Sequence, residues 1–244
     1  MAKFGKWLGG GLGWALGGPI GAILGFAVGS AIDSVVSVDG DVVISHSNQR
    51  NKPNDFSLSL LVLIAAVMKA DGKVVKSELD YVKQFFLKQF GSNHTQELLI
   101  TLRDILQKEI PVHEVCLQIK TYTLYPARLQ LIHLLFGVAA VDGHVHHNEL
   151  NVIQQIASYL GIKPNDFASI KAMFFKEVDG DYKILEIDKN VADEEVKKAY
   201  RRMAVKYHPD KVSHLGDEFQ HSAKEKFQKV QEAYENIKKQ RGLN

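Results

Sequence analysis

VKKAYRRMAVKYHPDK, residues 196–211, combines an amphipathic helix with an abrupt stop. Val196, Ala199 and Met203 recur at the spacing of one helical face, and most of the remaining positions are basic or polar. Pro209 ends this helix because its ring removes a backbone donor and steers the preceding residue away from helical angles. The pattern therefore predicts a basic amphipathic helix that stops at a polar loop.

A second amphipathic helix is predicted after this loop. Its apolar residues follow one another at spacings of three, four and three: Phe227, Val230, Tyr234 and Ile237. A short apolar helix is expected around Tyr182, and Asn190 is expected to cap the basic helix with Asp193 as its capping-box partner. These patterns predict two antiparallel helices with a polar tripeptide, His208-Pro209-Asp210, at their shared tip.

This C-terminal domain, residues 181–244, resembles the J domain. The resemblance rests on the tripeptide, on the basic helix before it and on the matching helix after it. It implies that the tripeptide and the basic side chains contact a DnaK-type chaperone and promote its ATP hydrolysis. The basic side chains are Lys197, Lys198, Arg201, Arg202 and Lys206. Charges of this kind chiefly speed and orient a transient encounter.

Composition places limits on the rest of the chain. Its 244 residues suffice for two small domains and an appendage, and its 45% hydrophobic and 24% charged content is ordinary for a folded protein. The net charge is only +2 and no aromatic platform accompanies the basic helix, so no nucleic-acid partner is expected. Cys116 is the only cysteine, which excludes an internal disulfide and fits a reducing compartment.

The middle domain, residues 56–175, uses one pattern twice at an offset of 71 residues. In each copy an apolar helix leads to an Asp-Gly turn, and a glutamate follows seven residues after the aspartate. The glycine is expected to end the first helix, and the glutamate falls near the next helix start, where a carboxylate is stabilising. The carboxylates are Asp71 and Glu78 in the first copy, and Asp142 and Glu149 in the second.

The same carboxylates have a second interpretation as a cation site. Asp-Gly followed by Glu is the second half of an EF-hand loop, but the earlier ligand positions hold Val67 and Lys69 in the first copy. An ordinary EF-hand is therefore excluded. Pseudo-symmetry still allows the four carboxylates to converge on a weak divalent cation, although we favour the helix-capping role. We expect no other cofactor, and we find no residues with the ligand spacing of a catalytic metal site.

The doubled pattern Asp-Gly-x-Val-x-x-x-Glu-Leu resembles the TerB family over roughly residues 56–165. The resemblance implies an all-helical fold with an acidic, metal-binding patch. Two functions follow from it. Either the middle domain accompanies a J-domain co-chaperone, or it is a metal- or stress-responsive domain whose output is the J domain.

The N-terminal segment, residues 1–32, is rich in glycine and carries no charge between Lys6 and Asp33. Its length exceeds the ~20 apolar residues that span a bilayer as a helix. Glycine occupies every fourth position: Gly9, Gly13, Gly17, Gly21, Gly25 and Gly29. Such a glycine zipper lets membrane helices approach closely, which predicts helix packing in the membrane and allows a homodimer. Residues 33–55 are polar and are predicted to form a linker.

Three arrangements of this segment stay open: a single span, a membrane-embedded hairpin broken at residues 17–19, and a soluble packing segment. A secretory signal peptide is not favoured because no clear cleavage site follows. Lys3 and Lys6 favour a cytoplasmic N-terminus, and a single span would then place the remaining chain outside. The J-domain resemblance requires a cytoplasmic location, and it takes precedence because its motif is more specific.

The order of anchor, TerB-like domain and terminal J domain resembles the DjlA family of bacterial inner-membrane co-chaperones. The resemblance implies that the J domain faces the cytoplasm and recruits a DnaK-type chaperone to a membrane site or client. No catalytic triad and no phosphate-binding glycine loop is present in the sequence. The protein is therefore expected to stimulate an enzyme and not to be one.

Overall fold

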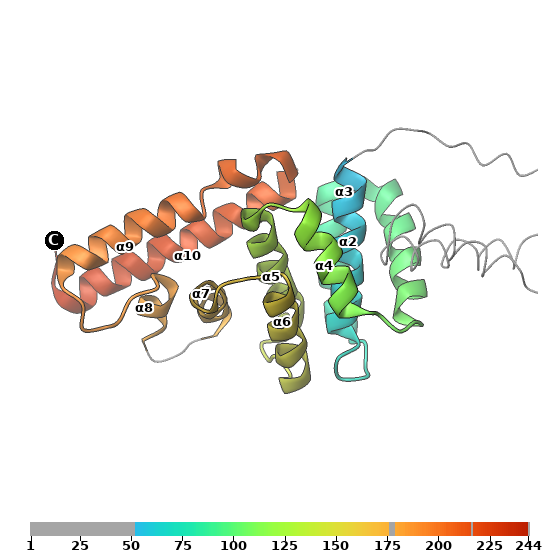
Figure 1. Ribbon diagram of the computed structural model, residues 1–244, viewed down its shortest axis with the longest axis horizontal. Coiled ribbons are helices and arrows are strands. Elements are labelled where there is room, and N and C mark those ends of the chain that lie inside the picture. The colour runs from blue at the N-terminus through green and yellow to red at the C-terminus, as the bar shows by residue number, and fades with distance from the viewer. Residues whose placement is uncertain (1–51, 176–178, 216, 244) are drawn as a thin grey trace, which may run out of the picture.

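The computed structural model describes residues 52–175, 179–215 and 217–243, and these residues are helical throughout, without a strand (Figure 1). The all-α class is confirmed. The glycine zipper, Gly9 to Gly29, lies outside the described residues. The middle domain contains α2 (Lys52–Met68), α3 (Lys76–Leu106), α4 (Val112–Tyr122), α5 (Tyr125–Ala139), α6 (His147–Tyr159) and α7 (Pro164–Phe174). The C-terminal domain contains α8 (Gly180–Ile184), α9 (Asp193–Lys206), the 3₁₀ helix η1 (Pro209–Leu215) and α10 (Asp217–Arg241).

Helix α2 is the centre of the middle domain. Residues 60–68 are all buried, and α2 packs on α3, α4, α5 and α6. A helix that is apolar on every face must be covered on every face, which explains this central position. The helix begins at Lys52, before the predicted boundary at residue 56, and Pro53 lies in its first turn, where proline is tolerated.

The two copies of the repeat form the helix–turn–helix that the sequence predicts. Gly72 and Gly143 take left-handed φ angles of 79° and 85° in the turns that follow the apolar helices. Each helix ends four residues before its glycine, α2 at Met68 and α5 at Ala139, so the glycines shape the turns and do not end the helices as predicted. The glutamates then cap the next helices. Oε2 of Glu78 accepts the N–H of Val75 at 3.1 Å, and the equivalent bond from His146 to Glu149 measures 2.9 Å. The predicted structural role of both glutamates is confirmed.

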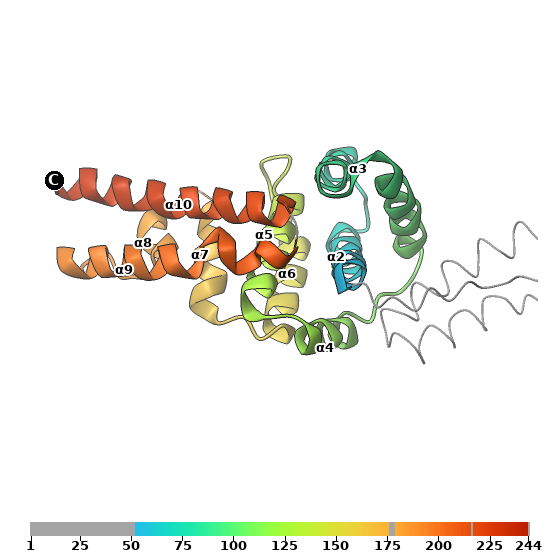
Figure 2. The same ribbon diagram turned by 90° about the horizontal axis from the view of Figure 1, so that it is seen from above.

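Helices α9 and α10 form the predicted antiparallel hairpin (Figure 2). The periodic residues Val196, Ala199 and Met203 are buried between them. Tyr200 and Tyr234 stack across the hairpin with ring centroids 4.3 Å apart. The hairpin therefore has its own apolar seam, as its sequence period requires.

The start of α9 differs from the prediction. Ala192 and not Asn190 is the N-cap residue, and no side chain caps the helix there. The carboxylate of Asp193 instead accepts a hydrogen bond from Arg241 Nη1 at 2.9 Å. Arg241 also donates to the hydroxyl of Tyr182 at 3.0 Å. The predicted capping box was wrong because α9 begins at Asp193, which is therefore the first helical residue and not the third.

The two domains share one continuous core. Helix α10 packs on α3 and α5, η1 packs on α5, and α7 packs on α8. The rings of Phe85 and Phe219 meet edge to face with centroids 5.7 Å apart. The hydroxyl of Ser169 donates to the carbonyl of Ile184 at 2.8 Å. Figure 2 shows the beginning of α10 beside α5, so the hairpin tip lies at the boundary between the domains.

Candidate functional site

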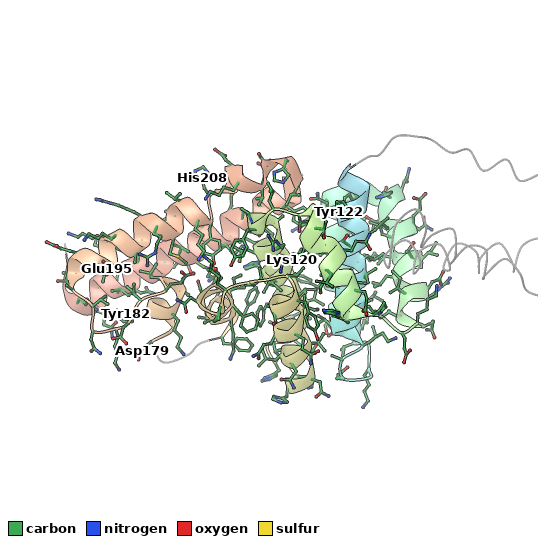
Figure 3. All side chains as sticks on the ribbon, in the orientation of Figure 1. Lys120, Tyr122, Asp179, Tyr182, Glu195 and His208 are labelled. Carbon is green, nitrogen blue, oxygen red and sulfur yellow. The ribbon has the colours of Figure 1, made fainter. Side chains whose placement is uncertain are left out.

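The tripeptide lies at the tip of the hairpin, where α9 ends and η1 begins (Figure 3). The backbone N–H of Asp210 donates to Nδ1 of His208 at 3.3 Å. Nδ1 of His208 also lies 3.5 Å from Oδ2 of Asp210, so the polar contacts of this side chain within the loop run through Nδ1. The side chain of His208 is 53% exposed and that of Asp210 is 88% exposed. Both side chains are therefore accessible to a partner.

Local contacts fix the backbone of this loop. The N–H of Lys211 donates to the carbonyl of His208 at 3.1 Å. The hydroxyl of Ser213 donates to the carbonyl of Asp210 at 2.9 Å. Pro209 starts η1, where its missing N–H costs no helical hydrogen bond. The loop thus presents two exposed polar side chains on a constrained backbone.

Tyr207 anchors the tripeptide to the core. The residue is 3% exposed, and its N–H donates to the carbonyl of Met203 at 2.9 Å. The ammonium groups of Lys206 and Lys226 lie over its ring, 5.7 and 5.1 Å from the centroid. Burial raises the pKa of the Tyr207 hydroxyl, so the residue stays neutral. Cation–π contacts of this kind help to hold an aromatic ring between two elements.

Four of the five predicted basic residues lie exposed along α9: Lys197, Lys198, Arg201 and Arg202. Arg202 pairs with Glu195, with 3.6 Å between Nη1 and Oε1. Both side chains are more than 40% exposed, so this pair is weak and leaves the arginine available to a partner. The acidic residues of α9 are confined to its first turn, and positive charge therefore dominates the part of α9 that leads to the tripeptide.

Lys206 is placed differently from the other four. Its ammonium group forms ion pairs with Asp166 of α7 and, at 2.5 Å, with Glu186. Asp166 is 1% exposed and also accepts the hydroxyl hydrogen of Tyr125 at 2.5 Å. Lys206 was predicted to bind the chaperone, but the structure turns it toward the middle domain. The sequence carries no sign of this because its partners come from α7 and the segment after α8.

Lys226 is a residue that the sequence reasoning missed. Its side chain is fully buried, and Nζ donates to the carbonyl of Leu129 in α5 at 3.2 Å. Burial lowers the pKa of this ammonium group well below its ordinary value. The signal was present in the sequence, because Lys226 occupies a regular position of the apolar seam. The other members of that seam are Ala223, Val230, Ala233 and Ile237.

The predicted carboxylates come together only in part. Glu78 and Glu149 are buried and hydrogen-bond to each other, whereas Asp71 and Asp142 accept backbone N–H groups of their own turns. Burial and the hydrogen bond that protonated Glu78 donates to Glu149 raise the pKa of Glu78. The part of the chain that the structure describes holds no group of three or more side chains suited to bind a metal ion. The divalent-cation site therefore stays a prediction.

Comparison with known protein families covers three successive segments of the chain. The model of the DnaJ domain matches residues 181–241, that of the tellurite resistance protein TerB matches 57–172, and that of the co-chaperone DjlA transmembrane domain matches 1–51. The chain is a J-domain protein with a TerB-like domain, and it resembles the DjlA family. The middle domain is called the TerB-like domain below, and the C-terminal domain is called the J domain.

Curated relatives match either most of the chain or a short stretch of it. Co-chaperone protein DjlA of Vibrio vulnificus (strain CMCP6) is 28% identical over 236 residues, covering 80% of this chain and 82% of the relative. The DjlA protein of Vibrio cholerae is 26% identical over 234 residues, with 80% and 81% covered. Chaperone protein DnaJ of Anaplasma marginale is 54% identical, but over 54 residues that cover 22% of this chain and 13% of the relative. No solved structure matches the chain.

These findings support a J-domain co-chaperone with a membrane anchor. The anchor corresponds to the segment that matches the DjlA transmembrane domain. None of the helices in residues 52–175, 179–215 and 217–243 combines the length and apolarity that a membrane span requires.

Proposed function

We propose that this protein stimulates the ATPase of a DnaK-type chaperone and recruits that chaperone to a membrane site or client. The observation that carries the proposal is the exposure of His208 and Asp210 on a constrained loop at the end of the basic helix α9. This arrangement supports regulation of a partner, because the tripeptide offers contacts and no catalytic constellation accompanies it. In this proposal, the ATP that is hydrolysed is bound to the chaperone and not to this protein.

The geometry supports a division of labour between helix and loop. The exposed basic side chains of α9 attract an acidic surface and orient the encounter, an effect that salt weakens. The loop then supplies the directional contacts, through the imidazole of His208 and the carboxylate of Asp210. Because the backbone of the loop is already fixed, little entropy is lost when these contacts form.

We further infer that the anchor lies in the bacterial inner membrane and that the J domain faces the cytoplasm. The resemblance of residues 1–51 to the DjlA transmembrane domain supports the first part. The second part follows from the partner, since a DnaK-type chaperone and its ATP are cytoplasmic. The glycine zipper supports close packing of two anchors in a homodimer.

The test is the single-turnover ATPase rate of a DnaK-type chaperone with the full-length protein in detergent micelles. The wild type is expected to stimulate strongly, and His208→Gln is expected to abolish stimulation. His214→Gln is the matched control, because His214 is exposed in η1 but lies outside the tripeptide. Stimulation that survives in His208→Gln, or no stimulation by the wild type, would contradict the proposal.

A second function, a metal-responsive TerB-like domain with the J domain as output, is supported by the buried pair of Glu78 and Glu149. Binding of calcium or manganese should then release or absorb heat and should raise the thermal stability of the protein. Both effects should weaken in Asp71→Ala and Asp142→Ala. Unchanged stability and no binding heat with the wild type would reject this function.

A further inference from the structure

The three most exposed large hydrophobic residues in the described part of the chain lie at the end of α4, just before α5 and at the end of α9. Tyr122 is 81% exposed, Leu124 is 66% exposed and Val205 is 63% exposed, and the next such residue, Ile100, reaches only 49%. Tyr122 ends α4 and Leu124 precedes α5 in the TerB-like domain, whereas Val205 belongs to α9 of the J domain. Single exposed apolar residues are ordinary, but an exposed apolar cluster marks an interaction site.

Polar contacts hold this junction together. The hydroxyl of Tyr125, the neighbour of Leu124, donates to Asp166 at 2.5 Å. Lys206, the neighbour of Val205, pairs with the same carboxylate. Both ribbon views show the beginning of α5 next to the end of α9 (Figures 1 and 2). Asp166 therefore ties the start of α5, which Leu124 precedes, to the end of α9, which carries Val205.

The junction continues the surface that carries the tripeptide. Val205 follows Arg201 by four residues and Arg202 by three, so it shares their side of α9. Val205 also precedes His208 by three residues. Val205 thus lies between the exposed basic residues of α9 and the tripeptide.

The TerB-like side of the junction carries charge of the same sign as α9. Lys120 and Lys163 are both exposed, and the N–H of Lys163 donates to the hydroxyl of Tyr125 at 3.0 Å. An acidic partner that docks on the basic side of α9 would therefore meet favourable charge on the TerB-like domain as well.

We propose that the TerB-like domain supplies part of the chaperone-docking surface, with Tyr122 and Leu124 contacting the same DnaK-type chaperone that engages α9 and the tripeptide. The proposal rests on the proposed function. Continuity with the basic side of α9 and charge of the same sign select this occupant. Aromatic and apolar side chains in a preorganised surface contribute affinity, whereas the tripeptide governs the response of the chaperone.

The decisive variant is Leu124→Asp in the full-length protein. Aspartate is a favoured N-cap residue, and Leu124 is the N-cap of α5, so the variant is expected to fold. The substitution removes an apolar contact and adds a charge of the same sign as the acidic partner. The half-saturating concentration for ATPase stimulation should rise about fivefold or more, the size expected for one important interface side chain. The maximal rate should not change because the tripeptide is intact.

Ile100→Asp is the matched control, because Ile100 is exposed on α3, away from the J domain, and should leave half-saturation unchanged. Tyr122→Ser provides a second, uncharged variant and should also raise the half-saturating concentration. Unchanged half-saturation in both Leu124→Asp and Tyr122→Ser, with normal stimulation by the wild type, would overturn this inference and leave the proposed function standing. A loss confined to the maximal rate would also overturn it.

Photo-crosslinking shows which molecule contacts position 124. Benzoylphenylalanine at position 124 of the full-length protein should crosslink to the ATP-bound chaperone. Crosslinks only to a second copy of this chain, or only to detergent or lipid, would overturn the inference. A wild type that neither stimulates nor crosslinks would overturn both proposals. Crosslinking without stimulation would support docking and contradict the proposed ATPase function.

Discussion

Asp166 of the TerB-like domain and Lys206 of the J domain form an ion pair across the boundary between the domains. The carboxylate is nearly inaccessible, and Tyr125 and Glu186 complete the polar cluster around the pair. A buried charge that loses its partner is strongly destabilising, so the pair favours one relative position of the two domains. The J domain is thereby joined to the TerB-like domain as one body.

Lys206 and Arg201 are expected to respond differently to substitution. Lys206→Met leaves Asp166 without its cation and should lower the free energy of unfolding by about 2–4 kcal/mol, with little direct effect on chaperone affinity. Arg201→Met removes an exposed charge and should leave stability nearly unchanged while it raises the half-saturating concentration for ATPase stimulation. Urea unfolding and ATPase titration of both variants provide the measurement.

The double variant Asp166→Asn with Lys206→Met is the control for this prediction. It removes both charges together, so it should be more stable than the sum of the single changes implies. A Lys206→Met protein with normal stability and weakened chaperone affinity would show that Lys206 binds the partner instead.

Glu78 should make stability fall as the pH rises. Burial and the hydrogen bond that protonated Glu78 donates to Glu149 raise the pKa of Glu78 from 4.5 to about 8, so the folded state keeps a proton that the unfolded state releases between these values. The free energy of unfolding should therefore decrease from about pH 5 to about pH 8. Glu78→Gln keeps the capping function without the charge and should be more stable than the wild type by roughly 1–2 kcal/mol near pH 8.

Urea unfolding of the wild type and Glu78→Gln across this pH range gives the measurement. Glu97→Gln is the control, because the Glu97 side chain is 77% exposed on the same helix, α3. This control should retain the wild-type pH dependence. Parallel pH profiles for the wild type and Glu78→Gln would show that the glutamate pair holds no extra proton.

Gly137 allows helices α3 and α5 to approach closely. A Cβ atom at this position would lie 3.1 Å from Cζ of Tyr81 and would contact its hydroxyl oxygen even more closely. Gly137→Ala should therefore lower the free energy of unfolding by about 1–3 kcal/mol. The cost should shrink when Tyr81→Phe removes the hydroxyl, which a double-mutant cycle of urea unfolding measures. Gly180→Ala, whose Cβ meets nothing within 4 Å, should have a much smaller effect.

Cys116 should be protected from thiol reagents in the folded protein. Its side chain is fully buried, and burial raises the pKa of the thiol to about 12, so little reactive thiolate forms. Because the chain has one cysteine, the reaction with a chromogenic disulfide reports on this site alone. Labelling should be slow in buffer and complete in denaturant. Rapid labelling without denaturant would contradict the packing of α4 against the core.

The sequence by itself determined the features that depend on neighbours a few residues apart. The period of Val196, Ala199 and Met203 predicted the buried face of α9, and Pro209 predicted its end. The Asp-Gly turns and the capping glutamates of the repeat were equally local. Such patterns act through one helical turn, so they can be recognised before the chain is folded.

Only the tertiary structure decided which distant residues meet. Glu78 and Glu149 lie 71 positions apart, and Lys206 meets Asp166 from another domain. A helical period shows that a helix has a polar side, but not whether another domain will cover part of it. Lys206 therefore read as an ordinary surface lysine, although packing between the domains removes it from full contact with water. Which group pairs with a buried charge therefore depends on the packing of the whole fold.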